Sequence, residues 1–393
     1  MLKFKGINSL RRITSKGDFT PEIDGLRFLA ILPVVLMHIN TNFIRVFGAP
    51  DSYLNSEVNR FVHFGELGVR FFFAISGFVL ANAFAKFFKS NKSFRSFDLK
   101  GYYYRRLTRL EPPFFISTIT LFFFTGLVVV GNLKSIIPNL IATLTYTHYL
   151  WYGKWSVINP VTWSLEVEVQ FYLLAPFLGW LFFSFFKQRI TNILLVALIV
   201  AVPIIFVRPH SIFVDNPHLT KGLVVYFSHF AVGILMSSIY NSVHWIKVKQ
   251  AYFFDIVCIA AIVGLFAFYP PNIGFSYIFD LCILLIMVCS FKAKLFNRFF
   301  SNIYISTIGG MCYSIYLIHY SVVFGLMKVT KSIRFDNFYV NICFHTALSL
   351  LVIIAISTLF YKWFERPFMD KKWPQKLKNF VVVKYRQRFN QSI

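Results

Sequence analysis

Ten stretches of the sequence are apolar almost without interruption, and each is about as long as a helix must be to cross a bilayer. Apolar residues occur on every side of these stretches, without the alternation that marks the strands of a membrane barrel. We therefore predict an all-α fold, a polytopic membrane helical bundle of about ten transmembrane helices. The predicted spans are 23–44, 66–87, 112–131, 161–185, 190–207, 222–240, 252–269, 275–291, 306–327 and 338–361.

The composition agrees with this pattern and excludes a water-soluble protein. Of the 393 residues, 57% are hydrophobic, 50 are phenylalanine and only 14% are charged, which no ordinary soluble domain shows. The connections between the apolar stretches are short, so we expect one membrane domain at residues 23–363. A basic N-terminal tail at residues 1–22 and a basic C-terminal tail at residues 364–393 are expected to flank it.

The net charge of +24 is concentrated on one side of the predicted bundle. Of the 40 lysines and arginines, 29 fall in the tails and connections of one side, nine fall on the other side, and Arg27 and Arg70 lie within spans. By the positive-inside rule both termini are predicted to be cytoplasmic, as an even number of spans requires. The basic side is expected to meet anionic membrane lipids, not nucleic acid, because the aromatic residues fill the spans and do not alternate with exposed cations.

Polar residues within spans are costly and therefore are candidates for function. In "PEIDGLRFLAILPVVLMHIN", Arg27 and His38 are 11 residues apart, which places them on the same helix face and about 16 Å apart along the axis. Asp24 lies one turn before Arg27. On the residues alone, an interfacial arginine with its head group in water and a histidine bonded to a neighbouring helix explain this pattern equally well.

Five motifs in order give the chain a resemblance to a known family. They are "DGLRFLAILPVVLMH", "GVRFFFAISGF" at 68–78, "RRLTRLEPPF" at 105–114, "WSLEVEVQFYLL" at 163–174 and "YSIYLIH" at 313–319. Together they span about 300 residues, and the chain resembles the acyltransferase family 3 membrane proteins, which transfer acyl groups, often acetyl, onto surface carbohydrates. The resemblance implies a ten-helix bundle with cytoplasmic ends in the bacterial inner membrane, and a protein related to the O-acetyltransferases of lipopolysaccharide O-antigen and other surface polysaccharides.

The resemblance implies an integral membrane O-acyltransferase that moves an acyl group, most often acetyl, from cytosolic acyl coenzyme A to a hydroxyl of a surface or lipid-linked carbohydrate. His38 is the expected general base, or a transient acyl carrier. Glu168 matches the family's acidic position and is expected to orient His38 or to pair with Arg27 or Arg70; the alternative is a salt bridge that fixes helix packing. The cysteines show no C-x-x-C pattern, so no metal is expected.

The donor is expected to meet the arginines at the start of the third span. Arg105, Arg106 and Arg109 occur at helical spacings, and their planar guanidiniums, with that of Arg27, suit the phosphates of acyl coenzyme A. The alternative is a stop-transfer cluster that contacts lipid phosphates.

Other buried polar candidates are Arg70, Ser76 and His319. Ser76 is expected to donate a hydrogen bond across the bundle beside Gly77, which lets another helix approach. Two rival functions stay open: another class of membrane-embedded acyltransferase centred on His319, and a polysaccharide flippase or exporter without enzymatic activity. The sequence leaves the acyl group, the sugar and the oligomeric state undetermined.

Overall fold

The computed structural model describes residues 10–13, 19–90, 93–268, 276–370 and 373–375, and all regular secondary structure within these ranges is helical. Eight helical segments are long and apolar enough to cross a membrane. They are Pro21–Phe47 (α2), Glu57–Phe88 (α4, Glu57–Val62, and α5, Gly65–Phe88), Leu99–Val130 (α6, Leu99–Phe124, and a π turn), Pro160–Phe185 (containing α9, Trp163–Trp180), Gln188–Phe206 (α10), Leu223–Tyr240 (α12), Cys312–Val329 (α18) and Phe338–Met369 (beginning with α19, Phe338–Phe360).

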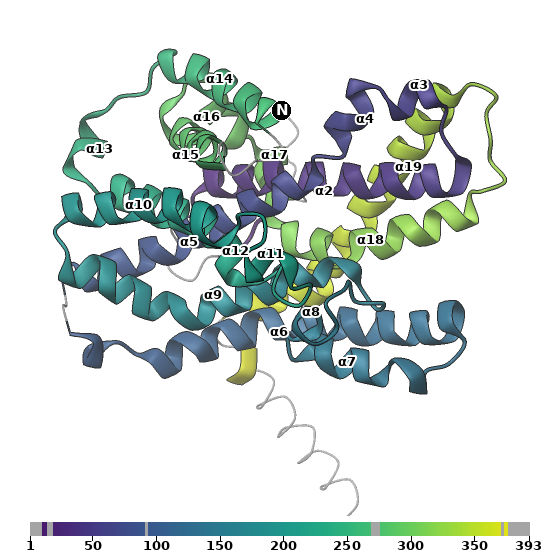
Figure 1. Ribbon diagram of the computed structural model, residues 1–393, viewed down its shortest axis with the longest axis horizontal. Helices are drawn as coiled ribbons and strands as arrows, with labels where there is room; N and C mark the ends of the chain where they lie inside the picture. The colour runs from purple at the N-terminus through teal and green to yellow at the C-terminus, as the bar shows by residue number, and fades with distance from the viewer. Residues whose placement is uncertain (1–9, 14–18, 91–92, 269–275, 371–372, 376–393) are drawn as a thin grey trace, which may run out of the picture.

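The two other predicted spans correspond to shorter helices. They are α14 (Phe253–Ala267, 15 residues) and α15 (Ser276–Lys292, 17 residues), which pack against each other (Figure 1). The all-helical membrane architecture is thus confirmed, whereas the count of ten spans and the cytoplasmic position of the termini stay predictions. The connections contain α3 (Asp51–Leu54), α7 (Ile137–Leu144), α8 (His148–Tyr152), α11 (Ile212–Asp215), α13 (Val243–Lys247), α16 (Leu295–Phe300) and α17 (Ile303–Gly310).

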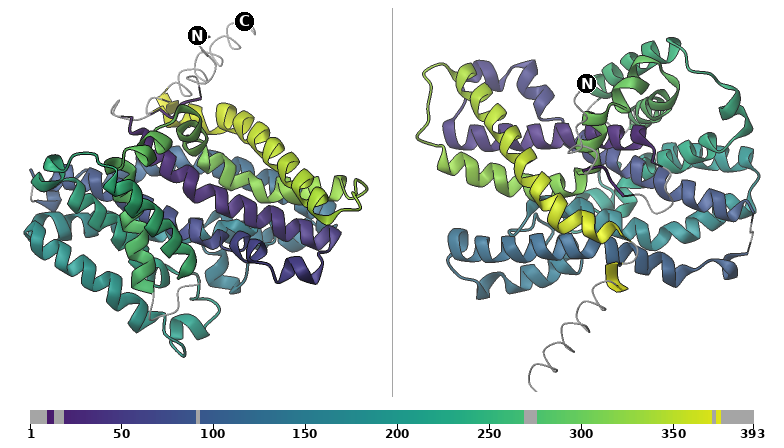
Figure 2. Two further views of the ribbon diagram at one scale, coloured as in Figure 1. Left: turned by 90° about the horizontal axis from the view of Figure 1, so that it is seen from above. Right: turned by 180° about the vertical axis from the view of Figure 1, so that it is seen from behind.

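Helix α2 lies at the centre of the contacts that build the site. It packs against α5, α17 and α18, and α18 packs in turn against α19. Figures 1 and 2 show α2 and α18 side by side on one flank, while α5, α9, α10 and α12 form the other flank. The core between these helices consists of aromatic and branched aliphatic side chains, among them Phe71, Phe171 and Phe230.

A close crossing of α5 and α12 explains the helix-weakening pair Ser76-Gly77. A Cβ at Gly77 would meet the backbone of Phe230 in α12, and a Cβ at Gly233 in α12 would meet the backbone of Ala74 in α5. Each glycine therefore removes an atom that would separate the two backbones. The expected close approach of another helix at Gly77 is confirmed.

Gly77→Ala should therefore destabilise the protein by about 1–3 kcal/mol, because the added methyl group has no space without a backbone shift. The measurement is thermal unfolding in detergent. Gly325→Ala is the matched control, since Gly325 also lies in a membrane helix but a Cβ there meets nothing within 4 Å; it should be neutral or slightly stabilising. Equal effects of the two substitutions would contradict the close-crossing explanation.

The ninth predicted span, 306–327, is divided into two helices. Helix α17 ends at Gly310 and α18 begins at Cys312, after the pair Gly309-Gly310, which weakens helix propagation. A Cβ at Gly309 would collide with the backbone carbonyl of Asp24, so the glycine lets α17 approach the start of α2. The break brings the beginning of α18 close to Asp24 and Arg27.

Helix α6 begins 13 residues before its apolar stretch, at Leu99. The Asp98 side chain accepts a hydrogen bond from the Gly101 amide at 2.7 Å and caps the helix. Pro112 and Pro113 therefore lie inside α6 rather than at its start. Because Pro112 has no N–H to donate, the carbonyl of Thr108 is available to another donor, and the Trp373 indole donates to it at 2.9 Å.

Candidate active site

His38 of α2 and His319 of α18 lie together inside the bundle. Their ring centroids are 5.2 Å apart, and the ring of Tyr320 meets His38 edge-on at 5.1 Å. His319 is completely buried. The sequence did not predict that these two histidines are neighbours, because they are 281 positions apart in the sequence and each had a separate hypothesis.

The orientation of His319 is fixed by its own helix. Its Nδ1 lies 3.0 Å from the carbonyl of Ile315 and 2.9 Å from that of Tyr316. Since a carbonyl only accepts, Nδ1 carries the proton and donates it. The other ring nitrogen, Nε2, is buried and has no hydrogen-bond partner among the described residues. His319 therefore presents a lone pair in the interior of the bundle.

Glu168 of α9 is part of a separate hydrogen-bonded chain. Its Oε1 accepts from the Ser76 hydroxyl of α5 and from the Tyr172 hydroxyl one turn along α9, the latter at 2.5 Å. The structure thus brings together two predicted site residues, Ser76 and Glu168. Within the described residues, the hydrogen bonds of Glu168 go to these hydroxyls, and none goes to His38, Arg27 or Arg70.

The neighbouring acid, Glu166, points to a different part of the protein. It is buried, and its carboxylate accepts from the Tyr149 amide at 2.9 Å, which holds the start of α8 against α9. The two carboxylates diverge as expected for helical residues two positions apart. Glu166 is therefore a packing residue, and Glu168 is the acid of the candidate site.

The beginning of α2 carries a compact charged cluster. Asp24 and Arg27 form an ion pair one turn apart, and Arg12 contacts the same carboxylate with Nη1 3.3 Å from Oδ1. Burial lowers the pKa of Arg12 and the nearby Arg27 lowers it further, whereas Asp24 raises it. Arg12 thus lies against the start of α2 and joins the site, which the sequence analysis did not predict.

Two arginines of α6 complete what we call the arginine group: Arg12, Arg27, Arg106 and Arg109. Arg109 lies within electrostatic range of the other three. The guanidinium of Arg106 stacks over the rings of Tyr102 and Tyr172, 5.7 and 5.0 Å from their centroids. Tyr172 therefore connects the arginine group with Glu168 and Ser76.

Carboxylates do not neutralise the arginine group. Glu365, at the end of the segment Tyr361–Glu365, is buried near Arg12 and Arg109 and accepts from the Ser314 amide at 3.0 Å and from its hydroxyl at 2.5 Å. With Asp24, Glu365 and Glu168 all counted, four cations still face three acids. An excess of guanidinium charge in a partly buried place suits an anionic ligand.

The remaining predicted residues lie elsewhere. The Arg105 side chain is 53% exposed and forms an ion pair with Asp98 at 3.6 Å, so it does not converge with Arg106 and Arg109. One acid and one tyrosine of the site were not predicted from the sequence. Glu365 fell within the range assigned to the C-terminal tail, and Tyr172 had the signal of lying one turn after Glu168.

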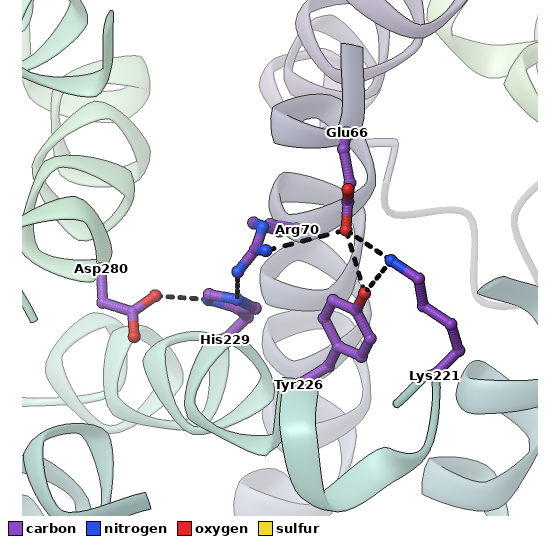
Figure 3. Close-up of polar contacts among 6 residues, drawn as sticks. All are labelled: Glu66, Arg70, Lys221, Tyr226, His229 and Asp280. Carbon is purple, nitrogen blue, oxygen red and sulfur yellow. Dashed lines mark hydrogen bonds and ion pairs between the residues drawn. The ribbon is translucent and has the colours of Figure 1, made fainter. Parts of the chain in front are cut away.

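Arg70 belongs to a second buried polar network, shown in Figure 3. Its guanidinium lies 3.1 Å from His229 Nε2 and 3.7 Å from the Glu66 carboxylate. His229 Nδ1 lies 2.5 Å from Asp280, and Glu66 also contacts Lys221 at 3.0 Å. Because Nε2 accepts from Arg70, His229 donates from Nδ1 to Asp280. The network ties α5, α12 and α15 together, and its histidine, His229, had no motif in the sequence.

No group of three or more His, Cys, Asp or Glu side chains within the described ranges is placed to hold a metal ion. The site contains two histidines, the hydroxyl groups around Glu168 and the cations of the arginine group.

Comparisons with known proteins give relatives over nearly the whole chain. O-acetyltransferase OatA of Staphylococcus aureus is 24% identical over 384 residues, which cover 90% of this chain and 58% of the relative. Peptidoglycan O-acetyltransferase OatA of Listeria monocytogenes is 22% identical over 394 residues, which cover 93% of this chain and 58% of the relative. The chain thus spans somewhat more than half the length of these relatives. No solved structure matches it significantly.

A family model described as an acyltransferase domain matches residues 20–362. The match covers α2 and α18, which carry the histidine pair. It also covers Arg27, Arg106 and Arg109 of the arginine group. It confirms the resemblance carried by the five sequence motifs: the chain belongs to acyltransferase family 3.

Proposed function

We propose that the protein is an integral membrane O-acetyltransferase, which transfers an acetyl group from acetyl coenzyme A to a hydroxyl of a cell-surface carbohydrate. The observation that carries this proposal is the pairing of His38 with His319. These histidines lie on α2 and α18, and both helices begin at the arginine group. The family and the names of the relatives support the reaction class.

The spacing within α2 suits the shape of the donor. Arg27 and His38 are 11 residues apart on one helix, a rise of about 16 Å. The extended phosphopantetheine arm of coenzyme A has a comparable length. Phosphates held by the arginine group would therefore place the thioester at the histidine pair.

His38 takes the proton from the acceptor hydroxyl as general base. The hydroxyl oxygen then bonds to the carbonyl carbon of the thioester, the carbon–sulfur bond breaks, and the proton passes from His38 to the departing thiolate. His319 Nε2, which can only accept, stabilises the N–H of the protonated His38. Neither step requires a metal or a redox change.

The acceptor is a carbohydrate of the cell surface or its lipid-linked precursor. One relative is named for peptidoglycan, a carbohydrate polymer outside the plasma membrane. The positive-inside charge distribution supports a bacterial inner membrane location with cytoplasmic termini, so the arginine group lies on the side where acyl coenzyme A is made.

Mass spectrometry of surface glycans from cells with and without the protein tests this function. Loss of one acetyl mass per modified sugar, together with consumption of acetyl coenzyme A by the purified protein and an acceptor glycan, is the expected result. Unchanged glycan acetylation combined with reduced glycan export would favour the flippase or exporter and contradict the proposal.

A further inference from the structure

The buried residues of the last long helix form a single row spaced by four along the chain. The buried residues of α19 and its continuation are Asn341, His345, Ser349, Ile353, Ser357, Tyr361 and Glu365. Leu351, two positions after Ser349, faces outward and is 68% exposed. We call these seven residues the α19 row. Five of the seven are polar, and polar side chains at a helix interface in lipid usually form hydrogen bonds to a neighbouring helix.

Four members of the α19 row have a polar atom that is buried and lacks a hydrogen-bond partner among the residues described. These atoms are Asn341 Oδ1, His345 Nε2, Ser349 Oγ and Ser357 Oγ. Both serines are completely buried, and His345 and Asn341 are 1% and 6% exposed. An unpartnered polar atom in such a place costs about 1–3 kcal/mol, so four in one row are not explained by packing alone.

Small size alone does not account for the two serines. A serine or threonine in a helix commonly donates to the carbonyl four residues earlier, as the lipid-facing Thr358 does to Ile354 at 2.7 Å. Ser349 and Ser357 do not make this bond in the described structure. His345 does bond its own helix, with Nδ1 2.9 Å from the carbonyl of Asn341, which leaves the lone pair of Nε2 free.

The α19 row passes the level of the histidine pair. Near one end, His345 packs on Phe47 and Phe43 of α2, with centroids 4.4 and 5.7 Å away. At the other end, Glu365 bonds to Ser314 of α18. His38 precedes Phe43 on α2 and His319 follows Ser314 on α18, so the pair lies between the two ends of the row. His319 Nε2 is a fifth buried polar atom without a partner in the described chain.

We infer that Asn341, His345, Ser349, Ser357 and His319 line a hydrated seam, in which water molecules bond to these atoms and connect the histidine pair with the membrane face near Asn341. A buried water needs two to four polar partners, and the row supplies one about every 6 Å of helix, except at Ile353. The opposite end is closed by Tyr361, which is completely buried, and by the bonded Glu365.

The seam gives the histidine pair an exchange route for protons with bulk water, and this use of it rests on the proposed function. In the proposed reaction His38 gives its proton to the departing thiolate; in a turnover in which the thiolate leaves first, His38 stays protonated and must lose this proton before the next turnover. Water in the seam provides that route without opening the site to lipid. The existence of the seam does not depend on the reaction.

Cysteine accessibility tests the seam directly. In a variant whose five native cysteines are replaced by alanine, Ser349→Cys and Ser357→Cys are exposed in detergent to a small charged methanethiosulfonate, which reacts with thiolates in water. We expect both to react at least tenfold faster than Leu351→Cys, which faces lipid, and Ile283→Cys, which is completely buried in α15. Rates equal to those of the two controls would show a dry row and overturn the inference.

Two further measurements keep the result independent of folding and of activity. Ser to Cys is nearly isosteric, and gel filtration of each variant checks its fold. Radiolytic hydroxyl-radical footprinting of the unmodified protein should oxidise His345 faster than its 1% exposure predicts, because radicals form from bound water. Protection of His345 from oxidation would contradict the seam. Fast labelling in a protein without acetyl transfer would support the seam and reject the proposed function.

Discussion

His38→Ala should reduce acetyl transfer by about 10²–10⁴-fold, the usual contribution of a general base, while the protein remains folded in the membrane. The imidazole lies against His319 and Tyr320, and an alanine there removes the base without introducing a charge into the bundle. Transfer is measured with purified protein, acetyl coenzyme A and an acceptor glycan, and gel filtration confirms the fold.

His319→Ala separates the two assignments within the histidine pair. If His38 is the base and His319 supports it, the loss at His319 should be smaller than the loss at His38. Full loss at His319 with wild-type transfer in His38→Ala would assign the base to His319, as the rival acyltransferase class predicts. His63→Ala is the control, because His63 is an exposed histidine whose Nδ1 bonds only the Asn59 carbonyl, at 2.8 Å.

The positions of the membrane helices could be predicted because a run of hydrophobic residues determines a membrane helix within its own segment. In its described residues every predicted span is largely helical, and the ninth contains two helices, since a bilayer requires every backbone group to be satisfied within its own segment. The shared helix of Arg27 and His38 followed from the same reasoning, because helical spacing is a property of one segment. The division at Gly309-Gly310 was missed, since it depends on the approach of α17 to Asp24, a contact between distant parts of the chain.

Contacts between helices could not be predicted from the sequence either, because they also join distant parts of the chain. Nothing near Ser76 shows that it bonds to Glu168, 92 positions away, and nothing near His38 shows that its neighbour is His319. The α19 row illustrates the limit most clearly. Its spacing by four is present in the sequence, but a serine in an apolar helix has no visible function until the packing shows which face is buried.

The arginines of α6 show how helical phase decides which predicted residue joins a site. Arg105 and Arg106 are 100° apart on the helix, and Arg109 lies between them in projection. The sequence cannot tell which of the two neighbours turns inward, because that depends on where α9 and α2 lie. In the structure Arg106 stacks on Tyr102 and Tyr172, while Arg105 is exposed beside Asp98.

This difference provides a matched test of donor binding. The double variant Arg106→Lys with Arg109→Lys should raise the KM for acetyl coenzyme A about tenfold or more, equivalent to about 1.4 kcal/mol, and should leave acceptor saturation little changed. Lysine keeps the charge but cannot form two parallel hydrogen bonds to a phosphate or stack on a tyrosine ring as a planar guanidinium does. The two positions are changed together, since residues that share one ligand are not additive.

Arg105→Lys is the control for this variant, because it makes the same chemical change on the same helix but at an exposed residue paired with Asp98. It should leave the KM for the donor unchanged, since an exposed ion pair contributes little and tolerates either cation. A lipid anchor requires only positive charge, so that reading predicts normal donor kinetics for every lysine variant and failed membrane insertion only when Arg106 and Arg109 are both alanine. Unchanged donor kinetics in the double lysine variant would therefore assign these arginines to the membrane surface, because charge alone would then be sufficient for everything they do.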